Sequence, residues 1–361
     1  MENFDVAKKL DNIKRKFREN RVGIERAVQD ELGIDLFASY LDTGLRNPII
    51  LAPGQLTQYR HQIEKAAKAG FGAAVLKSVV GEDKHGNASM KIFRRKPTFM
   101  RWYYDKDDTE HKYPIIHWNG GLDPRSLTDY LKFAKEAYES GKKADTPTIA
   151  SFLSHLPSTL DEEWKVEEWI YTAEKLFDMG YNHMEIDFCP FIKGENLAEN
   201  KEIVLRWYRE APGFVKDVSS DIKVVPKILN LDFGFDFQIE MVKAAKKGGA
   251  DGVTIANRFF RKVRDEKTGE EYRTAHGGRE LKEVNQREVA EAVNLGIPIS
   301  ATGGIYTGRD VWEYLSLGAK NTQLLTYVMK NGFEKSFESL LLDPKEGLII
   351  TMISKRTYSF R

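Results

Sequence analysis

The sequence of 361 residues contains only one cysteine, Cys189. A lone cysteine excludes an internal disulfide, and it cannot hold a zinc ion or an iron–sulfur cluster by itself. We therefore expect no metal centre in this chain. Any chain of electron carriers must belong to another protein or to a diffusible acceptor.

Long apolar runs and an excess of one charge are missing as well. No stretch approaches the roughly 20 apolar residues of a membrane span, and the first residues lack the apolar core of a secretion signal. The 55 Lys and Arg nearly balance the 54 Asp and Glu, for a formal net charge of +1. This balance provides no general attraction to nucleic acid or anionic membranes. We expect a soluble, cytoplasmic protein that acts on a small molecule.

What the chain does have is a regular alternation of short apolar, β-branched runs with longer amphipathic segments. Such alternation is typical of an α/β fold with parallel strands and crossover helices. The candidate strands are 48–53, 73–78, 114–118, 147–152, 183–188, 223–228, 252–256, 298–302 and 321–326. The clearest candidate helices are 62–70, 236–248 and 307–318, the last of which begins with a Thr-x-x-Asp capping pattern.

Nine strands are one too many for a (β/α)8 TIM barrel. The exception is 114–118, because no helix separates it from the strand that ends at Ser78. The interval 79–113 is charged and aromatic instead. We therefore interpret 79–118 as an insertion over the barrel mouth and the other eight runs as the barrel. An open, doubly wound sheet is the alternative.

Residues 1–36 are expected to form an N-terminal helical extension to the barrel domain, 37–361. Apolar residues recur at helical spacing among many Lys and Arg, at Phe4, Ala7, Leu10, Ile13 and Phe17. A basic amphipathic helix can lie on a membrane surface. We favour the other interpretation, in which the helix packs on the barrel or on a second subunit.

The active site of such a barrel lies at the C-terminal ends of its strands. The first strand ends in Ala52-Pro53-Gly54, whose small residues let a flat ring approach the backbone. The second strand ends in Lys77-Ser78 and the fifth in Pro226-Lys227. Two lysines on opposite sides of one mouth favour an anionic ligand, or a ring that gains negative charge.

Two glycine pairs lie late in the chain. Gly303-Gly304 stands between the seventh strand and a helix, where backbone N–H groups can bind a phosphate. Gly277-Gly278 lies in the long loop after the sixth strand and would add further donors. Either pair alone is a common turn sequence, so their position at the mouth carries the inference.

The fourth strand runs into Asp187-Phe188-Cys189-Pro190-Phe191, which places a carboxylate and a thiol beyond its end. A buried cysteine is usually a small apolar residue. Beside two lysines, however, a thiol ionises more readily and can serve as a base. Both interpretations stay open on the residues alone, and the candidate catalytic residues are Cys189, Lys77 and Asp187.

In this order, the segments resemble the dihydroorotate dehydrogenase family over about residues 36–332. The resemblance rests on Asn47-Pro48, Ala52-Pro53-Gly54, Lys77-Ser78, Asn119-Gly120-Gly121-Leu122, 185–190, Lys227, Asn257, Gly277-Gly278 and the run 303–311. It implies bound FMN. The implied FMN contacts are Ala52, Pro53, Gly54, Lys77, Ser78, Asn119, Lys227, Gly277, Gly278, Gly303, Gly304 and Thr326.

The resemblance also implies an oxidoreductase of the CH–CH class. A cysteine base, carried onto Cys189, would remove a proton from one carbon while the adjacent carbon delivers hydride to flavin N5. The substrate would be dihydroorotate or another dihydropyrimidine, and the protein a homodimer. The electron acceptor, or a partner subunit in its place, stays open. The alternatives are an FMN barrel with different reductive chemistry and an inactive partner subunit.

Two departures from the family pattern concern the substrate and the phosphate. Family members typically show Asn-x-Ser-Cys-Pro-Asn after the fourth strand, where both Asn side chains bind orotate. This chain is one residue shorter there and has Asp187 and Phe191 at those positions, and Leu325 replaces the Gly of a Gly-Thr phosphate turn. Asp187 would repel a carboxylate, so we expect weak dihydroorotate oxidation and better binding of a ligand without one. The expected substrate contacts are Asn119, Asp187, Phe191 and Asn257.

Overall fold

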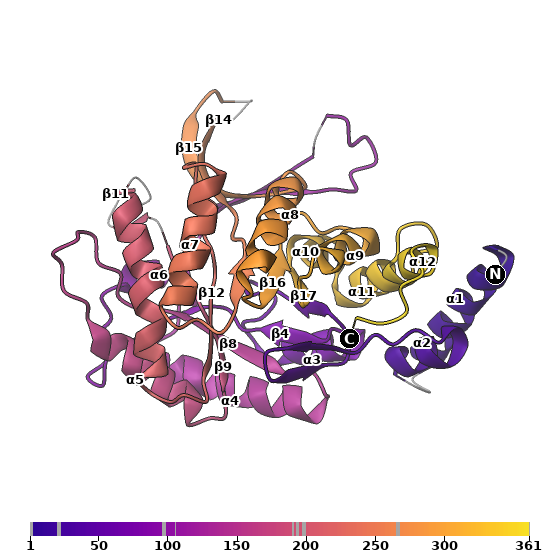
Figure 1. Ribbon diagram of the computed structural model, residues 1–361, viewed down its shortest axis with the longest axis horizontal. Coiled ribbons are helices and arrows are strands. Elements are labelled where there is room, and N and C mark those ends of the chain that lie inside the picture. Colours follow the sequence, from indigo (N-terminus) through magenta and orange to yellow (C-terminus); the bar gives the residue numbers. More distant parts are fainter. Residues whose placement is uncertain are drawn as a thin grey trace.

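Eight short parallel strands form the centre of the molecule, which we describe from a computed structural model (Figure 1). The structure describes residues 3–19, 23–95, 99–104, 106–189, 191–192, 195–196, 200–264 and 268–360. The barrel strands are β3 (Ile49–Leu51), β4 (Ala73–Val75), β8 (Thr148–Leu153), β9 (His183–Ile186), β12 (Lys223–Pro226), β13 (Val253–Ile255), β16 (Ile299–Thr302) and β17 (Asn321–Leu324).

The strands follow one another around a ring in the order β12-β9-β8-β4-β3-β17-β16-β13. Beyond β12, Lys227 pairs with Thr254 of β13, and the Ile228 amide donates to the Thr254 carbonyl at 2.9 Å. These contacts close the ring. The fold is therefore the predicted (β/α)8 barrel and not an open sheet.

Helices follow the strands and cover the outside of the barrel (Figure 1). They are α3 (Arg60–Ala69), α4 (Leu127–Lys143), α5 (Val166–Phe177), α6 (Lys201–Lys216), α7 (Phe235–Lys247), α8 (Leu281–Ala292) with η3 (Val293–Leu295), α9 (Gly308–Ser316), α10 (Thr326–Asn331), α11 (Phe333–Leu342) and α12 (Leu348–Ser354). The expected helices 62–70, 236–248 and 307–318 correspond to α3, α7 and α9. The capping pattern before α9 is confirmed, because Thr307 and Asp310 form a capping box.

The end of the barrel opposite the site is closed by a hairpin, β1 (Ala38–Tyr40) and β2 (Thr43–Leu45). Tyr40 and Leu45 are buried in one apolar cluster with Ile50, Val75 and other strand residues. The Tyr40 hydroxyl also donates to the Val253 carbonyl at 3.4 Å. The cavity described below lies at the opposite end, where the strands finish.

The N-terminal segment forms α1 (Asn3–Arg18) and α2 (Ile24–Leu32), at one edge of the molecule near α11 and α12 (Figure 1). Val6, Leu10 and Ile13 of α1 are buried in the main hydrophobic core. An ion pair of 2.6 Å between Arg18 and Glu338 joins α1 to α11. These three apolar residues of α1 therefore pack inside the protein, where α1 contacts α2 and α11.

No helix in the described ranges is long and apolar enough to cross a membrane.

A four-stranded antiparallel sheet, which we call the mouth sheet, lies beyond the barrel strands in the order β14-β15-β7-β6. Its strands are β6 (Phe99–Tyr103), β7 (Ile115–Asn119), β14 (Phe259–Arg264) and β15 (Glu271–Gly277). The exclusion of 114–118 from the barrel is confirmed, since β7 pairs only within this sheet. Between β4 and β6 lie β5 (Val79–Val80), which pairs with β8, and η1 (Lys91–Phe93).

The expected long loop after the sixth strand is mostly a β-hairpin, β14 and β15, which projects from the barrel (Figure 1). The sequence signal was weak because charged residues interrupt both strands, in Phe-Phe-Arg-Lys-Val-Arg and Glu-Tyr-Arg-Thr-Ala-His. Strands at the surface need no apolar run. Two insertions far apart in the sequence thus build one sheet over the mouth.

Candidate active site

A cavity of about 410 Å³ lies at the C-terminal ends of the barrel strands, next to the mouth sheet. This volume falls in the usual range for small-molecule sites, about 300–1,000 Å³. The structure brings nearly all predicted site residues to its wall, namely Ala52, Pro53, Gly54, Lys77, Ser78, Asn119, Asp187, Cys189, Lys227, Asn257, Gly277, Gly278, Gly303, Gly304 and Thr326. The side chain of Phe191 lies outside the described part. The individual roles of these residues stay predictions.

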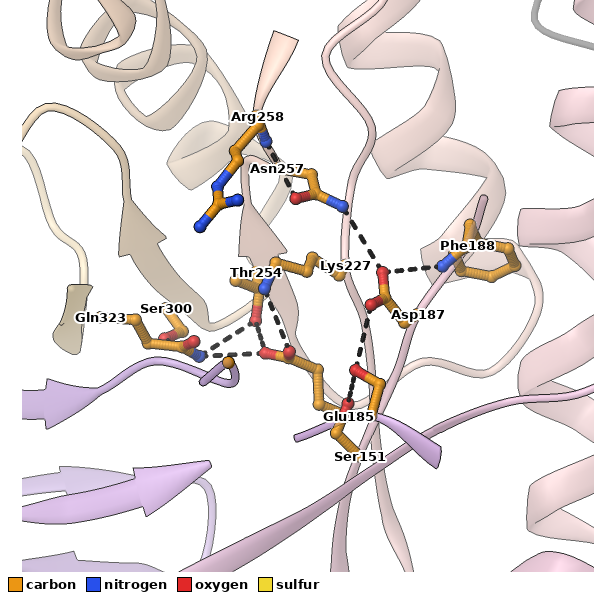
Figure 2. A network of polar contacts seen from close by, with 12 residues as sticks. Ser151, Glu185, Asp187, Phe188, Lys227, Thr254, Asn257, Arg258, Ser300 and Gln323 are labelled. Carbon is orange, nitrogen blue, oxygen red and sulfur yellow. Dashed lines mark hydrogen bonds and ion pairs between the residues drawn. The ribbon is translucent and has the colours of Figure 1, made fainter. Parts of the chain in front are cut away.

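A buried ion pair lies at the base of the cavity (Figure 2). The Lys227 Nζ is 3.4 Å from Glu185 Oε1, and both side chains are almost fully buried. The other carboxylate oxygen of Glu185 accepts hydrogen bonds from Thr254 (2.7 Å) and Gln323 (3.0 Å). Glu185 points into the barrel from β9, a role that the sequence analysis missed. A charged residue inside an apolar strand was the available signal, because a buried charge needs partners.

Asp187, two residues after Glu185, lies at the cavity wall and is held by several donors (Figure 2). The Ser78 hydroxyl donates to Oδ2 at 3.0 Å, and the Phe188 amide donates to Oδ1 at 3.0 Å. Asn257 Nδ2 lies 3.5 Å from the same Oδ1. Burial raises the pKa of Asp187, and the positive charge of Lys227 opposes this rise.

A second group of cations gathers around the indole of Trp118, which belongs to β7 of the mouth sheet. The Lys77 Nζ and the Arg258 guanidinium carbon each lie 4.8 Å from the centre of the indole ring. Burial lowers the pKa of Lys77 to about 8 and that of Arg258 to about 10. Gly120 allows this arrangement, because a Cβ there would overlap the indole. We call Lys77, Trp118 and Arg258 the indole cluster.

Arg258 and Trp118 were both missed as site residues. Arg258 directly follows Asn257 at the end of the sixth strand, and Trp118 directly precedes Asn119, so each stood beside a predicted residue. Position next to a strand end was the available signal for Arg258. For Trp118 there was none, because only the pairing of β7 with β15 brings it over the cavity.

Several polar atoms at the wall have no partner within the described part of the protein. These buried atoms are Gln55 Oε1, Trp118 Nε1, Arg258 Nη1 and Gln323 Oε1. A buried polar group without a hydrogen bond is unfavourable by about 1–3 kcal/mol. Their convergence on one cavity indicates that a polar ligand completes it.

The turn after β16 is prepared to present backbone N–H groups. Gly303 and Gly304 have φ angles of +103° and +64°, which side-chain-bearing residues rarely adopt. A Cβ at Gly304 would also lie 2.7 Å from the Lys282 backbone nitrogen. The Asp310 carboxylate accepts from the amides of Tyr306 and Thr307, both at 2.9 Å, and so holds the chain that follows the turn.

Cys189 follows β9 at the cavity wall and is partly buried. The chain continues into a short hairpin, β10 (Phe191–Ile192) and β11 (Glu195–Asn196). Cys189 thus lies in the same cavity as Lys77, Lys227 and Asp187. This position is consistent with contact to a ligand.

Comparison with known proteins identifies the family. The model of the dihydroorotate dehydrogenase family matches residues 135–340, which is more than half of the chain. The chain belongs to this family.

Curated members of the dihydroorotate dehydrogenase family are similar over most of their length. A protein of Pyrococcus abyssi is 28% identical over 304 residues, covering 80% of this chain and 86% of its own. Proteins of Fusobacterium nucleatum (26% over 285 residues, 76% and 81%) and Bacillus caldolyticus (28% over 283 residues, 76% and 79%) are also similar. All three are named dihydroorotate dehydrogenase B (NAD(+)), catalytic subunit. The protein is thus an oxidoreductase of the dihydroorotate dehydrogenase type.

Proposed function

We propose that the cavity binds FMN and that the protein oxidises a cyclic dihydropyrimidine-like carbonyl compound, removing hydrogen from two adjacent carbons. Family membership and one observation support this proposal. One cavity at the strand ends is lined by Lys227, which pairs with Glu185, by Cys189 and by the Gly303-Gly304 turn. Such a wall has separate places for a ring, a proton acceptor and a phosphate.

The residues present fit FMN. A Cβ at Gly54 would overlap Leu325, so this position accepts only glycine. The cavity wall at the end of the first strand is therefore formed by backbone. The unpartnered amide oxygens of Gln55 and Gln323 can accept hydrogen bonds from N–H or O–H donors of the bound cofactor. The ring would be held by Ala52, Pro53, Gly54, Lys77, Ser78, Asn119 and Lys227, and the phosphate by backbone N–H groups of Gly277, Gly278, Gly303, Gly304 and Thr326.

FMN, when bound, supplies the acceptor for a hydride from the substrate carbon. The protein's own residues supply the proton transfer and the charge. Cys189 accepts the proton from the neighbouring carbon, and the cations Lys77 and Lys227 in the same cavity favour its thiolate form. The positive charge of Lys227 would stabilise the negative charge that the ring gains during reduction. Asp187 accepts an N–H of the substrate ring.

Electrons then leave to an acceptor outside this chain. The similar proteins of Pyrococcus, Fusobacterium and Bacillus are named catalytic subunits of an NAD(+) enzyme. By analogy, we propose a partner subunit that passes electrons to NAD(+), and a homodimer of this chain. The lone Cys189 supports the need for a partner, since one cysteine cannot hold an iron–sulfur cluster.

The test is anaerobic reduction of the flavin that co-purifies with the protein, followed by its absorbance. A positioned base contributes about 10²–10⁴-fold in rate. The variant Cys189→Ala should therefore stay yellow but reduce its flavin that much more slowly with dihydroorotate or dihydrouracil. Cys189→Ser is the matched variant and should retain part of the rate. A loss below threefold would assign the base to Asp187 or to the insertion, and a colourless protein that takes up no FMN would refute the proposal.

A further inference from the structure

A second cavity, of about 710 Å³, lies between the segment 83–94 and the start of α5. The proposed reaction uses none of the residues that line it, and its volume suits a small molecule. Three cationic and three carboxylate side chains belong to its wall, namely Lys91, Arg94 and Lys165 against Asp83, Glu167 and Glu168. Charges of both signs in equal number suit a ligand that itself carries both charges.

Glu168 is the buried acceptor of this cavity and is only 3% exposed. Ser89 donates to its Oε1 through the backbone amide at 2.9 Å and through the hydroxyl at 2.5 Å. The other oxygen, Oε2, is buried and has no partner among the described residues. Burial raises the pKa of Glu168, and the hydrogen bonds from Ser89 oppose this rise. Oε2 therefore needs a donor, and a cationic donor would also compensate the buried charge.

Arg94 is the matching donor on the same wall. Its Nη2 lies 2.6 Å from Glu82 Oε1 and donates to the Val80 carbonyl at 3.0 Å. Its Nε is buried and has no partner in the part of the chain that the structure describes. Nε therefore needs an acceptor oxygen. The exposed Lys91 and Lys165 of the same cavity favour an acceptor with negative charge.

These two unsatisfied atoms restrict the class of ligand. An ammonium group supplies both the donors and the positive charge that Glu168 lacks, and a carboxylate supplies the acceptor for Arg94. A simple amine would leave Arg94 Nε without an acceptor, and a simple anion would be repelled by Glu168. A small molecule with both groups, as in a free amino acid, satisfies the two atoms together.

The second cavity and the active-site cavity share the segment 91–95, which contains η1, as a wall. Lys91 and Arg94 line the second cavity, whereas Ile92, Phe93 and Arg95 line the active-site cavity. A ligand that restrains Arg94 therefore restrains a segment that also borders the active site.

The same segment holds the loop 119–122, which belongs to the active-site wall. The Leu122 amide donates to the Phe93 carbonyl at 2.8 Å. A Cβ at Gly121 would lie 2.3 Å from that carbonyl oxygen, so the two segments are closely packed. A change in the position or mobility of 91–95 is thus passed to this loop.

We propose that the second cavity binds a free amino acid, whose ammonium group contacts Glu168 and whose carboxylate contacts Arg94, and that the segment 91–95 couples this site to the active-site cavity. The site is regulatory, because its ligand holds Ser89 and Arg94 on either side of η1. It stands apart from the proposed function, since neither Glu168 nor Arg94 lines the active-site cavity.

Calorimetric titration of the purified holoenzyme with each of the standard L-amino acids tests the binding. The amino acid that binds most tightly is then compared with the amine that lacks its carboxylate and the acid that lacks its ammonium group. For alanine these are ethylamine and propionate. The amino acid should bind at least about tenfold more tightly than either, because each loses one charged hydrogen bond. The proposal is overturned if no amino acid binds at millimolar concentration, or if the amine or the acid binds as tightly.

Three variants place the binding in the second cavity. Glu168→Gln keeps an acceptor for Ser89 and should lose about 10- to 100-fold in affinity for the amino acid. Lys91→Glu changes an exposed residue, so its folding is not at risk, and should lose about fivefold. The control is Lys135→Glu, an exposed position of α4 outside both cavity walls, which should bind as wild type does. Unchanged affinity in both Glu168→Gln and Lys91→Glu would refute the site.

Hydrogen exchange followed by mass spectrometry tests the coupling. A saturating amino acid should slow exchange in 89–95 and also in 119–122, where the Leu122 amide is bonded to Phe93. Glu168→Gln at the same concentration should show neither change. Slower exchange in 89–95 alone would overturn the role given to the segment 91–95.

Discussion

Two cationic regions of the same cavity differ in how their charges are compensated. In the inner pair, Lys227 faces Glu185, which also accepts from Thr254 and Gln323. In the indole cluster, Lys77 and Arg258 lie over Trp118, and the Arg258 Nη1 has no partner among the described residues. In the first region the charges compensate each other within the protein, and in the second they do not.

This difference separates stability from recognition. Removing one member of a buried ion pair leaves the charge of the other uncompensated in the low dielectric of the core, which destabilises the folded protein. A buried cation without a counter-charge destabilises the empty protein already, and a ligand anion can compensate it. The inner pair should therefore matter most for folding, and the indole cluster most for binding.

The largest expected effect follows from breaking the inner pair. Lys227→Ala leaves Glu185 buried without its counter-charge and should lower the free energy of unfolding by about 3–5 kcal/mol. Denaturant unfolding of the flavin-free protein measures it. The double variant Lys227→Ala/Glu185→Gln should recover most of the loss. If the single variant is as stable as wild type, or if the double variant recovers nothing, the pair is not a unit and the comparison fails.

Replacing Lys77 should change the free energy of unfolding by a smaller amount and in the opposite direction. Burial lowers the pKa of Lys77 from 10.5 to about 8. At pH 7 the folded protein therefore keeps a positive charge at a buried position, where that charge is unfavourable. A shift of this size corresponds to about 3 kcal/mol. Lys77→Met should therefore stabilise the flavin-free protein at pH 7 by up to that amount. The advantage should shrink between pH 8 and pH 10.5, where only the unfolded chain keeps the proton.

The control for Lys77→Met is Lys65→Met, at an exposed position of α3. It should change stability by less than about 0.5 kcal/mol. Destabilisation by Lys77→Met would mean that Lys77 is compensated after all, and the contrast between the two regions would be lost.

The smallest effect concerns pH and ligand binding. With a pKa of about 8, Lys77 is charged at pH 7 and largely neutral at pH 9, while Arg258 (about 10) stays charged. The other charges near Lys77 are Asp187, Asp123 and Lys227. The affinity of the flavin-free protein for the anionic FMN should fall about fivefold over this range, which corresponds to about 1 kcal/mol for one nearby charge. Lys77→Met should remove the dependence, and a dependence that persists would assign it to Asp187.

Much of the barrel was predictable because its strands are buried on both faces. A strand of this kind reads as a short apolar run, as in β3 (Ile49–Leu51), and needs no partner to be recognised. The hairpin β14–β15 was not predictable in the same way. Its strands face solvent in part, so packing leaves no regular apolar pattern in them.

The cavity residues divide along similar lines. Gly303 and Gly304 were found because a turn with positive φ selects glycine, which is a local requirement. Lys77 and Lys227 were found because parallel strands place their C-terminal ends together. Trp118 was missed because it comes from another insertion, and it reaches the cavity only through the pairing of β7 with β15, in which it lies opposite Ala275.

The sequence by itself determined the barrel, the side on which its site lies and the glycine turns, since these follow from local periodicity and backbone freedom. Only the tertiary structure decided which charges are compensated. Glu185 and Lys227 stand 42 residues apart and meet because β9 and β12 are neighbours in the sheet. Arg258 meets Trp118 because two separate insertions form one sheet over the mouth. Electrostatic interactions depend on distance in space and on burial, and neither can be read from spacing along the chain.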